Sequence, residues 1–410
     1  MNAETVGAGL LGLASVALWG RLALSLLPPG EPGSHRPAGL AATWAASHAL
    51  GLVVLLALGS VAAGVGLRWS GGLLWGTWCA LALLRAAFLP GSMVPRHLPP
   101  AQRARPLGTG LLAVVVVLTL LPAFATSVGG LEAGRLESLG AWAANAPWQA
   151  EPFRFLAPAS RLALVVMLLH GLAAAGLGPV VRRAGVLLLL VTPAFWAARS
   201  VWSDALQPAL LVATGCAGAI AWLRRADRRG AALAALAFAA CPAYERAALP
   251  LGAAGLLALV AHTHRNARRS VALGALGGLL PGLPSFAAWS VDADWSRPAA
   301  AAGDVARELF RAAGHWATGG PFWYAVGAAA AIGAIRELLP AGPAPDPSRR
   351  ARRMLATTVV LAFAGAIAVG AAAERLDVGT FVDARFLLEA APAGLLLVVL
   401  TFGHQERVAR

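Results

Sequence analysis

Three short stretches of the sequence place an arginine beside a carboxylate at the boundary between a polar connector and an apolar segment. Arginine offers fixed donors to phosphate oxygens, and a carboxylate within hydrogen-bond reach can accept the proton of a hydroxyl. We therefore expect these side chains to bind an anionic ligand such as a lipid phosphate, although each pair alone could simply satisfy a helix end. The pairs are Arg199 with Asp204, Glu245 with Arg246, and Asp383 with Arg385.

The connector GGLEAGRLESLGAWAANAPW at 129–148 supplies candidate general bases. Its apolar side chains recur at helical spacing over 131–145, which predicts an amphipathic helix lying on the membrane surface. Glu132 would then point away from lipid, and Glu137 would face a different direction. We expect Glu132 to be the base, with Glu137 as the second choice, and capping of the helix by Glu132 is the alternative interpretation.

The composition indicates a helical membrane protein. The chain has 410 residues, of which 58% are hydrophobic and 13% are charged, whereas soluble domains have about 45–50% apolar and about 25% charged residues. The apolar residues come in blocks of roughly 18 to 25, the length that crosses a bilayer. We predict an all-α, multi-pass bundle of about 12 to 13 spans. The expected spans are 6–27, 40–66, 70–90, 107–127, 159–178, 184–200, 204–223, 230–247, 249–263, 270–290, 321–340, 354–373 and 384–403.

The net charge of +14 comes from arginines that cluster in short connectors, which is the positive-inside pattern and not a sign of nucleic-acid binding. These connectors should face the cytoplasm, in the inner (plasma) membrane of a bacterial cell. The best defined lie at 95–105, 181–183, 224–229, 264–269 and 348–353. Alternation then places the acidic connectors outside, at 128–158, 200–204, 243–249, 291–320 and 373–384.

Some polar residues lie inside the apolar blocks. Glu389 comes one helical turn into the last span. For His48 the favoured interpretation is either a hydrogen bond between helices or a side chain that extends toward the membrane interface. The three cysteines are interpreted as small buried side chains, because they form no CxxC or metal-ligand spacing. These cysteines are Cys79, Cys216 and Cys241.

Three stretches resemble the GT-C superfold of polytopic glycosyltransferases, which includes protein O-mannosyltransferases and lipid A aminoarabinose transferases. LLPAFATSVGGLEAGRLESLGAWA is similar to a helix end with an acidic loop, VTPAFWAARSVWSDALQPALL to a proline-containing span and the next helix start, and ARFLLEAAPAGLLLVVL to a late helix. The resemblance covers about residues 107–403. It implies a sugar donor on a polyprenyl-phosphate carrier, with Glu132 where the catalytic acid of the family falls.

The sequence also departs from this family. The acidic pair of the family is Glu132-Ala133 here, and its loop follows the fourth span instead of the first. A rival alignment begins at the N-terminus, with PPGEPGSHRPAGLAATWAASHALG as the acidic loop and Glu31 as the base. Both alignments stay open, and so does a relative that has lost activity.

The expected organisation is N-terminal transmembrane helices over 1–106, a GT-C-like core over 107–403 with external loops at 128–158 and 291–320, and a cytoplasmic tail at 404–410. The favoured function is sugar transfer from the polyprenyl-phosphate donor at the external face, with membrane lipid and that donor as partners. A non-catalytic membrane subunit and a transporter or flippase of a lipid-linked substrate are the alternatives. No cofactor is indicated, and a divalent metal is left open.

Overall fold

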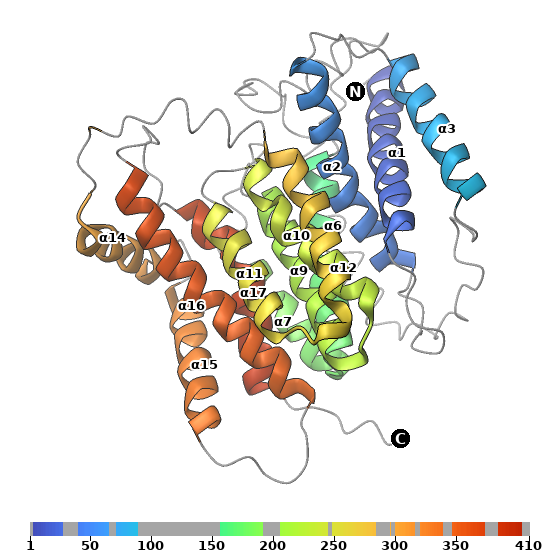
Figure 1. Cartoon of the computed structure of the whole chain (residues 1–410). Coiled ribbons are helices and arrows are strands. Elements are labelled where there is room, and N and C mark those ends of the chain that lie inside the picture. Colours follow the sequence, from blue (N-terminus) through green and yellow to red (C-terminus); the bar gives the residue numbers. More distant parts are fainter. Residues whose placement is uncertain are drawn as a thin grey trace. The chain divides into compact units, whose positions relative to one another are not determined.

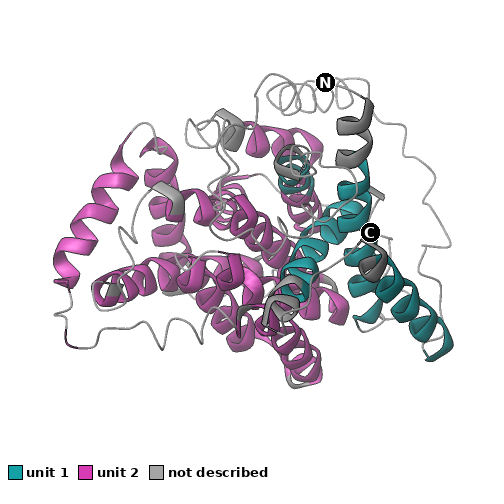
Figure 2. Cartoon of the chain, turned by 90° about the horizontal axis from the view of Figure 1, so that it is seen from above, with its two compact units in different colours: residues 1–28, 35–166, 200–202 teal, residues 29–34, 167–199, 203–410 magenta. Residues whose placement is uncertain are grey.

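The computed structural model divides the chain into two compact units, which we describe separately (Figure 2). Unit 1 comprises residues 1–28, 35–166 and 200–202, and unit 2 comprises 29–34, 167–199 and 203–410. The structure describes residues 3–27, 40–64, 71–88, 156–191, 206–244, 248–283, 296, 300–315, 320–338, 347–373 and 384–403.

The described residues form α-helices and short 3-10 turns, with no β-strand among them (Figure 1). Unit 1 contains α1 (Ala3–Leu26), α2 (Leu40–Gly64), α3 (Gly71–Phe88) and the first part of α6 (Leu156–Ala174). The helices of unit 2 are α7 (Pro179–Val191), α9 (Leu206–Arg225), α10 (Arg228–Tyr244), α11 (Leu249–His262), α12 (Arg268–Leu279), α14 (Ala302–Gly314), α15 (Gly320–Leu338), α16 (Pro347–Ala373) and α17 (Ala384–Phe402). The 3-10 turns η2 (Arg265–Ala267) and η3 (Leu280–Gly282) flank α12.

The all-helical prediction is confirmed for the described residues. Each predicted span that falls on them overlaps a helix, whereas the span predicted at 107–127 lies outside them. Three of the described helices contain a segment long and apolar enough to cross a membrane, at Ala41–Leu58, Leu206–Arg224 and Arg349–Ala372. The composition of these helices supports association of the chain with a membrane.

Helices α1 and α2 of unit 1 cross at two glycines. A side chain at Gly20 would collide with the backbone of Ser47, and a side chain at Gly51 would collide with the backbone of Val16. Small residues at such a crossing let two backbones approach closely, which is how helices gain packing energy when the surrounding lipid is as apolar as their own side chains. Glycine is therefore required at both positions.

Unit 2 is built around α10, an alanine-rich helix most of whose residues are buried. Helices α9, α11 and α12 all pack against it. On α12, Gly274 lies against the backbone of Ala232 and Gly278 lies against the backbone of Leu236. The two glycines are one helical turn apart, as are the two residues they meet, so α12 fits along α10 through a small-residue stripe.

Phe238 is the one large side chain in the middle of α10, and it is completely buried. Its ring lies against Gly215 of α9 and Gly255 of α11, neither of which has room for a side chain there. Pro242 of the same helix cannot donate a hydrogen bond to the carbonyl of Phe238. Gly252 of α11 lies against that carbonyl oxygen, so glycines accommodate both the ring and the proline.

The surface of unit 2 contains apolar side chains that a soluble protein would bury. Exposed leucines and valines follow helical spacing along α11, α12 and α16, opposite the faces that pack inward. They include Leu257, Val260, Leu273, Leu276, Leu280, Val360 and Leu361. Such continuous apolar faces are typical of helices that contact lipid.

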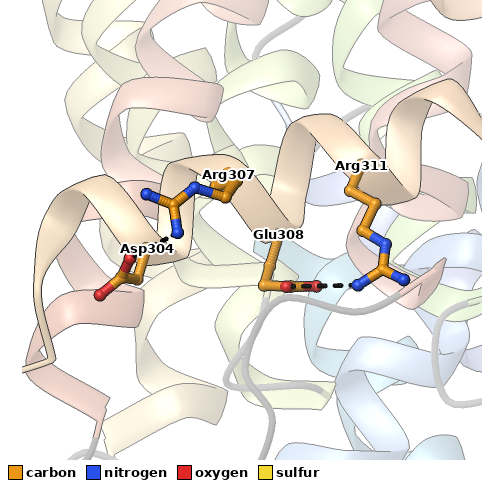
Figure 3. A network of polar contacts seen from close by, with 4 residues as sticks. All are labelled: Asp304, Arg307, Glu308 and Arg311. Atoms are coloured by element: carbon orange, nitrogen blue, oxygen red, sulfur yellow. Dashed lines mark ion pairs between the residues drawn. The ribbon is translucent and has the colours of Figure 1, made fainter.

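Helix α14 was missed by the sequence analysis, which treated 291–320 as a loop. Leu309 and Ala313 on one side of the helix are buried. The opposite side contains two exposed ion pairs, Arg307 with Asp304 at 3.1 Å and Arg311 with Glu308 at 3.7 Å (Figure 3). The amphipathic helix predicted at 131–145 lies outside the described residues, so α14 is a separate finding.

Candidate functional site

The helices of unit 2 define two opposite ends. Helices α9 and α10 form a hairpin through Ala226 and Asp227, so α10 ends where α9 begins, and α11 begins directly after α10. Cys241, near the end of α10, and Glu389, near the start of α17, are close enough to interact electrostatically. The first residues of α9, α11 and α17 and the last residues of α10 therefore lie together at one end of unit 2. We call it the carboxylate end, after Glu389.

The opposite end of unit 2, which we call the arginine end, contains the ends of α9, α11 and α17 and the starts of α7, α10, α12 and α16. Two side-chain contacts join some of these elements. Arg350 Nη1 of α16 lies 3.0 Å from His264 Nε2, just beyond α11. Arg352 Nη1 lies 3.5 Å from the carbonyl oxygen of Leu400 in α17. The basic connectors of unit 2 at 181–183, 224–229, 264–269 and 348–353 thus adjoin helix ends that lie at one end of the unit, as strict alternation of the spans predicts.

Of the predicted site residues, Arg385 alone falls in a described element, where it belongs to the first turn of α17. The others lie outside the described residues. They are Glu31, Glu132, Glu137, Arg199, Asp204, Glu245, Arg246 and Asp383.

The described helix ends that flank these residues do come together. Arg199 and Asp204 precede α9 in the sequence, Glu245 and Arg246 separate α10 from α11, and Asp383 precedes α17. Every one of these flanking helix ends belongs to the carboxylate end. The structure therefore brings together the elements that flank the three predicted pairs.

Glu389 is the charged residue that the structure adds to this end. Its side chain is completely buried on α17, four residues after Arg385. An ionised group within a bilayer costs about 2.5–3.5 kcal/mol on insertion scales and usually marks a functional position. The sequence signal was a single carboxylate within an apolar span, but Glu389 was not included among the predicted site residues.

Aromatic and polar side chains surround the starts of α17 and α9. Phe386 packs edge-to-face on Phe363 with ring centroids 5.5 Å apart, and Phe363 packs in the same way on Trp323 at 5.6 Å. Gln207 in the first turn of α9 and Tyr244 at the end of α10 are both buried. The carboxylate end thus combines a buried acid, a buried amide and a buried phenol with an aromatic wall from α15, α16 and α17.

At the arginine end, polar groups cap the ends of helices. Helix α6 ends in a Schellman motif, in which Leu177 N–H donates to Leu172 O at 3.2 Å and Gly176 N–H donates to Ala173 O at 3.0 Å. Gly176 has φ +74°, and the guanidinium of Arg224 lies directly against it. Arg224 Nη1 also lies 3.5 Å from the carbonyl oxygen of Ala174.

The start of α10 is capped by an acid at this same end. The backbone N–H of Arg229 donates to Asp227 Oδ1 at 3.1 Å. Burial lowers the pKa of the Arg229 guanidinium from its usual value, and the charge of Asp227 partly offsets that effect. Asp227 therefore supports both the helix start and a partly buried cation.

Unit 1 contains its own buried polar contact. His48 Nε2 of α2 lies 3.0 Å from Ser160 Oγ of α6, and the imidazole stacks on Trp44 with centroids 5.6 Å apart. Both hydrogen-bonding residues are buried. The interpretation of His48 as a residue that joins two helices is confirmed.

The described residues contain no group of three or more His, Cys, Asp or Glu side chains that could hold a metal ion. Cys216 and Cys241 are buried, as the sequence analysis expected, but Cys79 is exposed on α3, so that expectation was wrong for it. Helix α3 has few inward contacts along this part, and Leu83 and Leu84 beside Cys79 are exposed too.

Comparisons of the chain with protein-family models, with curated proteins and with solved structures found no match. Any activity must therefore be argued from the residues of this chain and their placement.

Proposed function

We propose that the chain is a multi-pass protein of the inner (plasma) membrane, GT-C-like in architecture, which transfers a sugar from a polyprenyl-phosphate carrier to an acceptor at the external face. The convergence of helix ends at the carboxylate end is the observation that supports this most. The helix ends that flank three arginine–carboxylate pairs meet there, next to the buried carboxyl of Glu389.

The proposed reaction needs a base and a phosphate-binding group. The acceptor oxygen attacks the anomeric carbon of the sugar, the bond from that carbon to the carrier phosphate breaks, and polyprenyl phosphate leaves. Glu132 takes the hydroxyl proton of the acceptor, which is a suitable role for a carboxylate within hydrogen-bond reach. Arg246 and Arg385 hold the phosphate as its negative charge increases.

The placement of these arginines suits a carrier embedded in lipid. Arg385 belongs to the first turn of α17, and Arg246 follows the end of α10 by two residues in the sequence. Cations at helix ends lie near the interfacial region, where charge costs less than at the bilayer centre. A polyprenyl phosphate presents its headgroup at the same depth, so binding needs little displacement of the lipid chain.

Helix α14 supports an interfacial site near the start of α15. The short connection from Gly314 to Gly320 keeps α14 next to the start of α15, and α14 also packs on α16. Its apolar side faces these helices, while its ion pairs face outward. A helix of this kind lies along a membrane surface and can border a site that opens there.

The test compares Glu132→Gln with a matched control, Glu308→Gln on the exposed side of α14. Purified protein in lipid vesicles is given a panel of polyprenyl-phosphate sugars together with a panel of hydroxyl-bearing acceptors, and released polyprenyl phosphate is measured. We expect Glu132→Gln to fold normally and to lower the rate at least about 100-fold, the size of lost acid–base catalysis. Glu308→Gln should keep the rate of the unaltered protein, because Glu308 is 63% exposed and pairs only with its own helix.

Each result has a distinct meaning. Absence of release by the unaltered protein across the panel would reject sugar transfer and favour a non-catalytic subunit. Full activity of Glu132→Gln would keep the enzyme but move the base to Glu31 or Glu137. Equal losses in both variants would show that the assay responds to surface charge and not to a base.

A further inference from the structure

Three helices of unit 2 share one surface pattern at the arginine end. On α11, the exposed residues Leu257 and Val260 lie at helical spacing from His264, which follows the helix. On α12, the exposed residues Leu273 and Leu276 lie at helical spacing from Arg269 in its first turn. On α16, the exposed residues Val360 and Leu361 likewise lie on the same side of the helix as Arg350 and Arg353 near its start. Each lipid-facing stripe therefore finishes in a basic side chain.

The basic side chains of these stripes lie close together. Helix α11 packs along α16 (Figure 1), and the contact of Arg350 Nη1 with His264 Nε2 at 3.0 Å joins their ends. In this contact Arg350 is the donor, because a guanidinium has no acceptor. Arg269 follows His264 by five residues, across the single turn η2. Arg350 and His264 are therefore in contact, and exposed Arg269 lies in the first turn of the next helix at the same end of unit 2.

The arginines are also placed against the helix dipoles. Helices α12 and α16 both begin here, and neither has an acidic residue in its first turn. The N-cap residue of α12 is Ala267, which offers no side-chain hydrogen bond to the first N–H groups. Positive charge at a helix start is unfavourable, whereas an anion there is favourable. An anion bound among these side chains would compensate both the dipoles and the clustered cations.

We propose that this place is a binding site for an anionic diacyl phospholipid. Its phosphate lies among His264, Arg269 and Arg350, and its acyl chains follow the exposed stripes of α11 and α12. The continuous apolar stripes favour a lipid over a free phosphate ester, because they adjoin the cations directly. The site is at the opposite end of unit 2 from the proposed sugar transfer and does not depend on it.

The experiment measures thermal unfolding of the purified full-length chain in a neutral detergent during titration with phosphatidylglycerol. Phosphatidylcholine tests the need for net negative charge, and glycerol phosphate tests the need for acyl chains. The variant is Arg269→Gln with Arg350→Gln. The matched control is Arg307→Gln with Arg311→Gln, which also removes two exposed arginines, but from α14.

We expect phosphatidylglycerol to raise the unfolding temperature at concentrations where phosphatidylcholine and glycerol phosphate have no effect. An arginine near an anionic lipid contributes about 1 kcal/mol, or about fivefold in affinity. The double variant should therefore need about 30-fold more phosphatidylglycerol, and the control variant should need no more than the unaltered protein. Gel filtration checks folding, and Arg269→Gln alone should give about a fivefold shift if the double variant fails to fold.

Four results would overturn the proposal. These are equal stabilisation by phosphatidylcholine, equal stabilisation by glycerol phosphate, unchanged affinity in the Arg269→Gln variants, and an equal loss of affinity in the α14 control. The first would indicate a purely apolar effect, the second a free phosphate ester, and the last a nonspecific response to net charge.

Discussion

The two ends of unit 2 hold charged side chains in different ways. At the arginine end, Arg224 and Arg352 lie beside the last carbonyls of helices and Asp227 caps the start of another. At the carboxylate end, Glu389 is completely buried, near Cys241. The charged side chains of the arginine end cap helix ends, where water or lipid headgroups can reach them. A buried carboxyl among apolar helices costs free energy and does not finish a helix.

This difference supports our proposal that the carboxylate end performs the chemistry and that the arginine end positions the chain in a membrane. Arginines clustered at one end of a helical bundle are the pattern that favours one orientation during membrane insertion. They also form a surface that anionic lipid can occupy. The carboxyl of Glu389 is completely buried within α17 and lies near the helix ends that flank the predicted pairs, so we assign the proposed function to its end. The central helix α10 connects the two ends, and altering it provides the strongest test of whether they are separable.

The largest expected effect comes from Phe238→Ala in the middle of α10. Phe238 is completely buried, and its neighbours Gly215 and Gly255 have no side chains that could fill the space left by the ring. Phe→Ala in cores costs about 3–5 kcal/mol. We expect about 3 kcal/mol, because helices in lipid lose packing contacts and little hydrophobic transfer energy.

Thermal unfolding in detergent measures this effect, and both sugar transfer and phospholipid binding should fall together. Ile335→Ala on the exposed side of α15 is the control and should leave the unfolding temperature nearly unchanged. A Phe238→Ala protein that loses one activity and keeps the other in full would show that the two ends do not share α10 as a common support.

The second effect is confined to the carboxylate end. We expect Glu389→Gln to lower sugar transfer at least tenfold, because an interaction with a charged group is worth about 1.5–3 kcal/mol. The unfolding temperature should stay the same or rise, since removing a buried charge removes its desolvation cost. Reduced function with retained or increased stability is what distinguishes a site residue from a structural one.

Arg352→Gln at the arginine end is the matched control for Glu389→Gln. Its guanidinium lies 3.5 Å from the carbonyl oxygen of Leu400 near the end of α17, at the opposite end of unit 2 from Glu389, so the transfer rate should be unchanged. If Glu389→Gln instead unfolds the protein while Arg352→Gln does not, Glu389 holds helices together and the assignment of function to this end loses its main residue.

Much of the helical architecture could be predicted because apolar block length and connector charge are local properties. Helix α10 matches the expected span at 230–247, and α17 matches the span at 384–403, each to within a few residues. The glycine contacts of Gly274 and Gly278 could not be predicted, because they depend on which helix lies opposite. Helix α14 was missed because its alternating charges and alanines do not resemble a span.

The candidate site could be predicted less well. Spacing showed that arginines and carboxylates flank apolar helices, but not which helix ends meet in space. The structure provides that information for α9, α10, α11 and α17, while most of the predicted residues themselves lie outside the described part of the chain. Glu389 was visible in the sequence, yet its burial and its proximity to Cys241 follow only from how α17 packs.

The smallest expected effects are changes in the free energy of unfolding at the arginine end. Substitutions at two helix ends there should change this free energy in opposite directions. Gly176 follows α6 with φ +74°, and Ala226 follows α9 with φ +56°. An L-residue in this left-handed region costs roughly 1–2 kcal/mol relative to glycine, offset in part by the greater freedom of glycine when unfolded. Ala226→Gly should therefore stabilise the protein by about 0.5–1 kcal/mol.

Gly176→Ala should destabilise the protein by about 1–2 kcal/mol, because the added methyl group also meets the guanidinium of Arg224. Thermal unfolding of both variants in one detergent checks the two signs, and the transfer rate should be unchanged in each. Destabilisation by Ala226→Gly would mean that the turn between α9 and α10 depends on more than backbone conformation. A loss of transfer in either variant would contradict the separation of helix capping at this end from chemistry at the other.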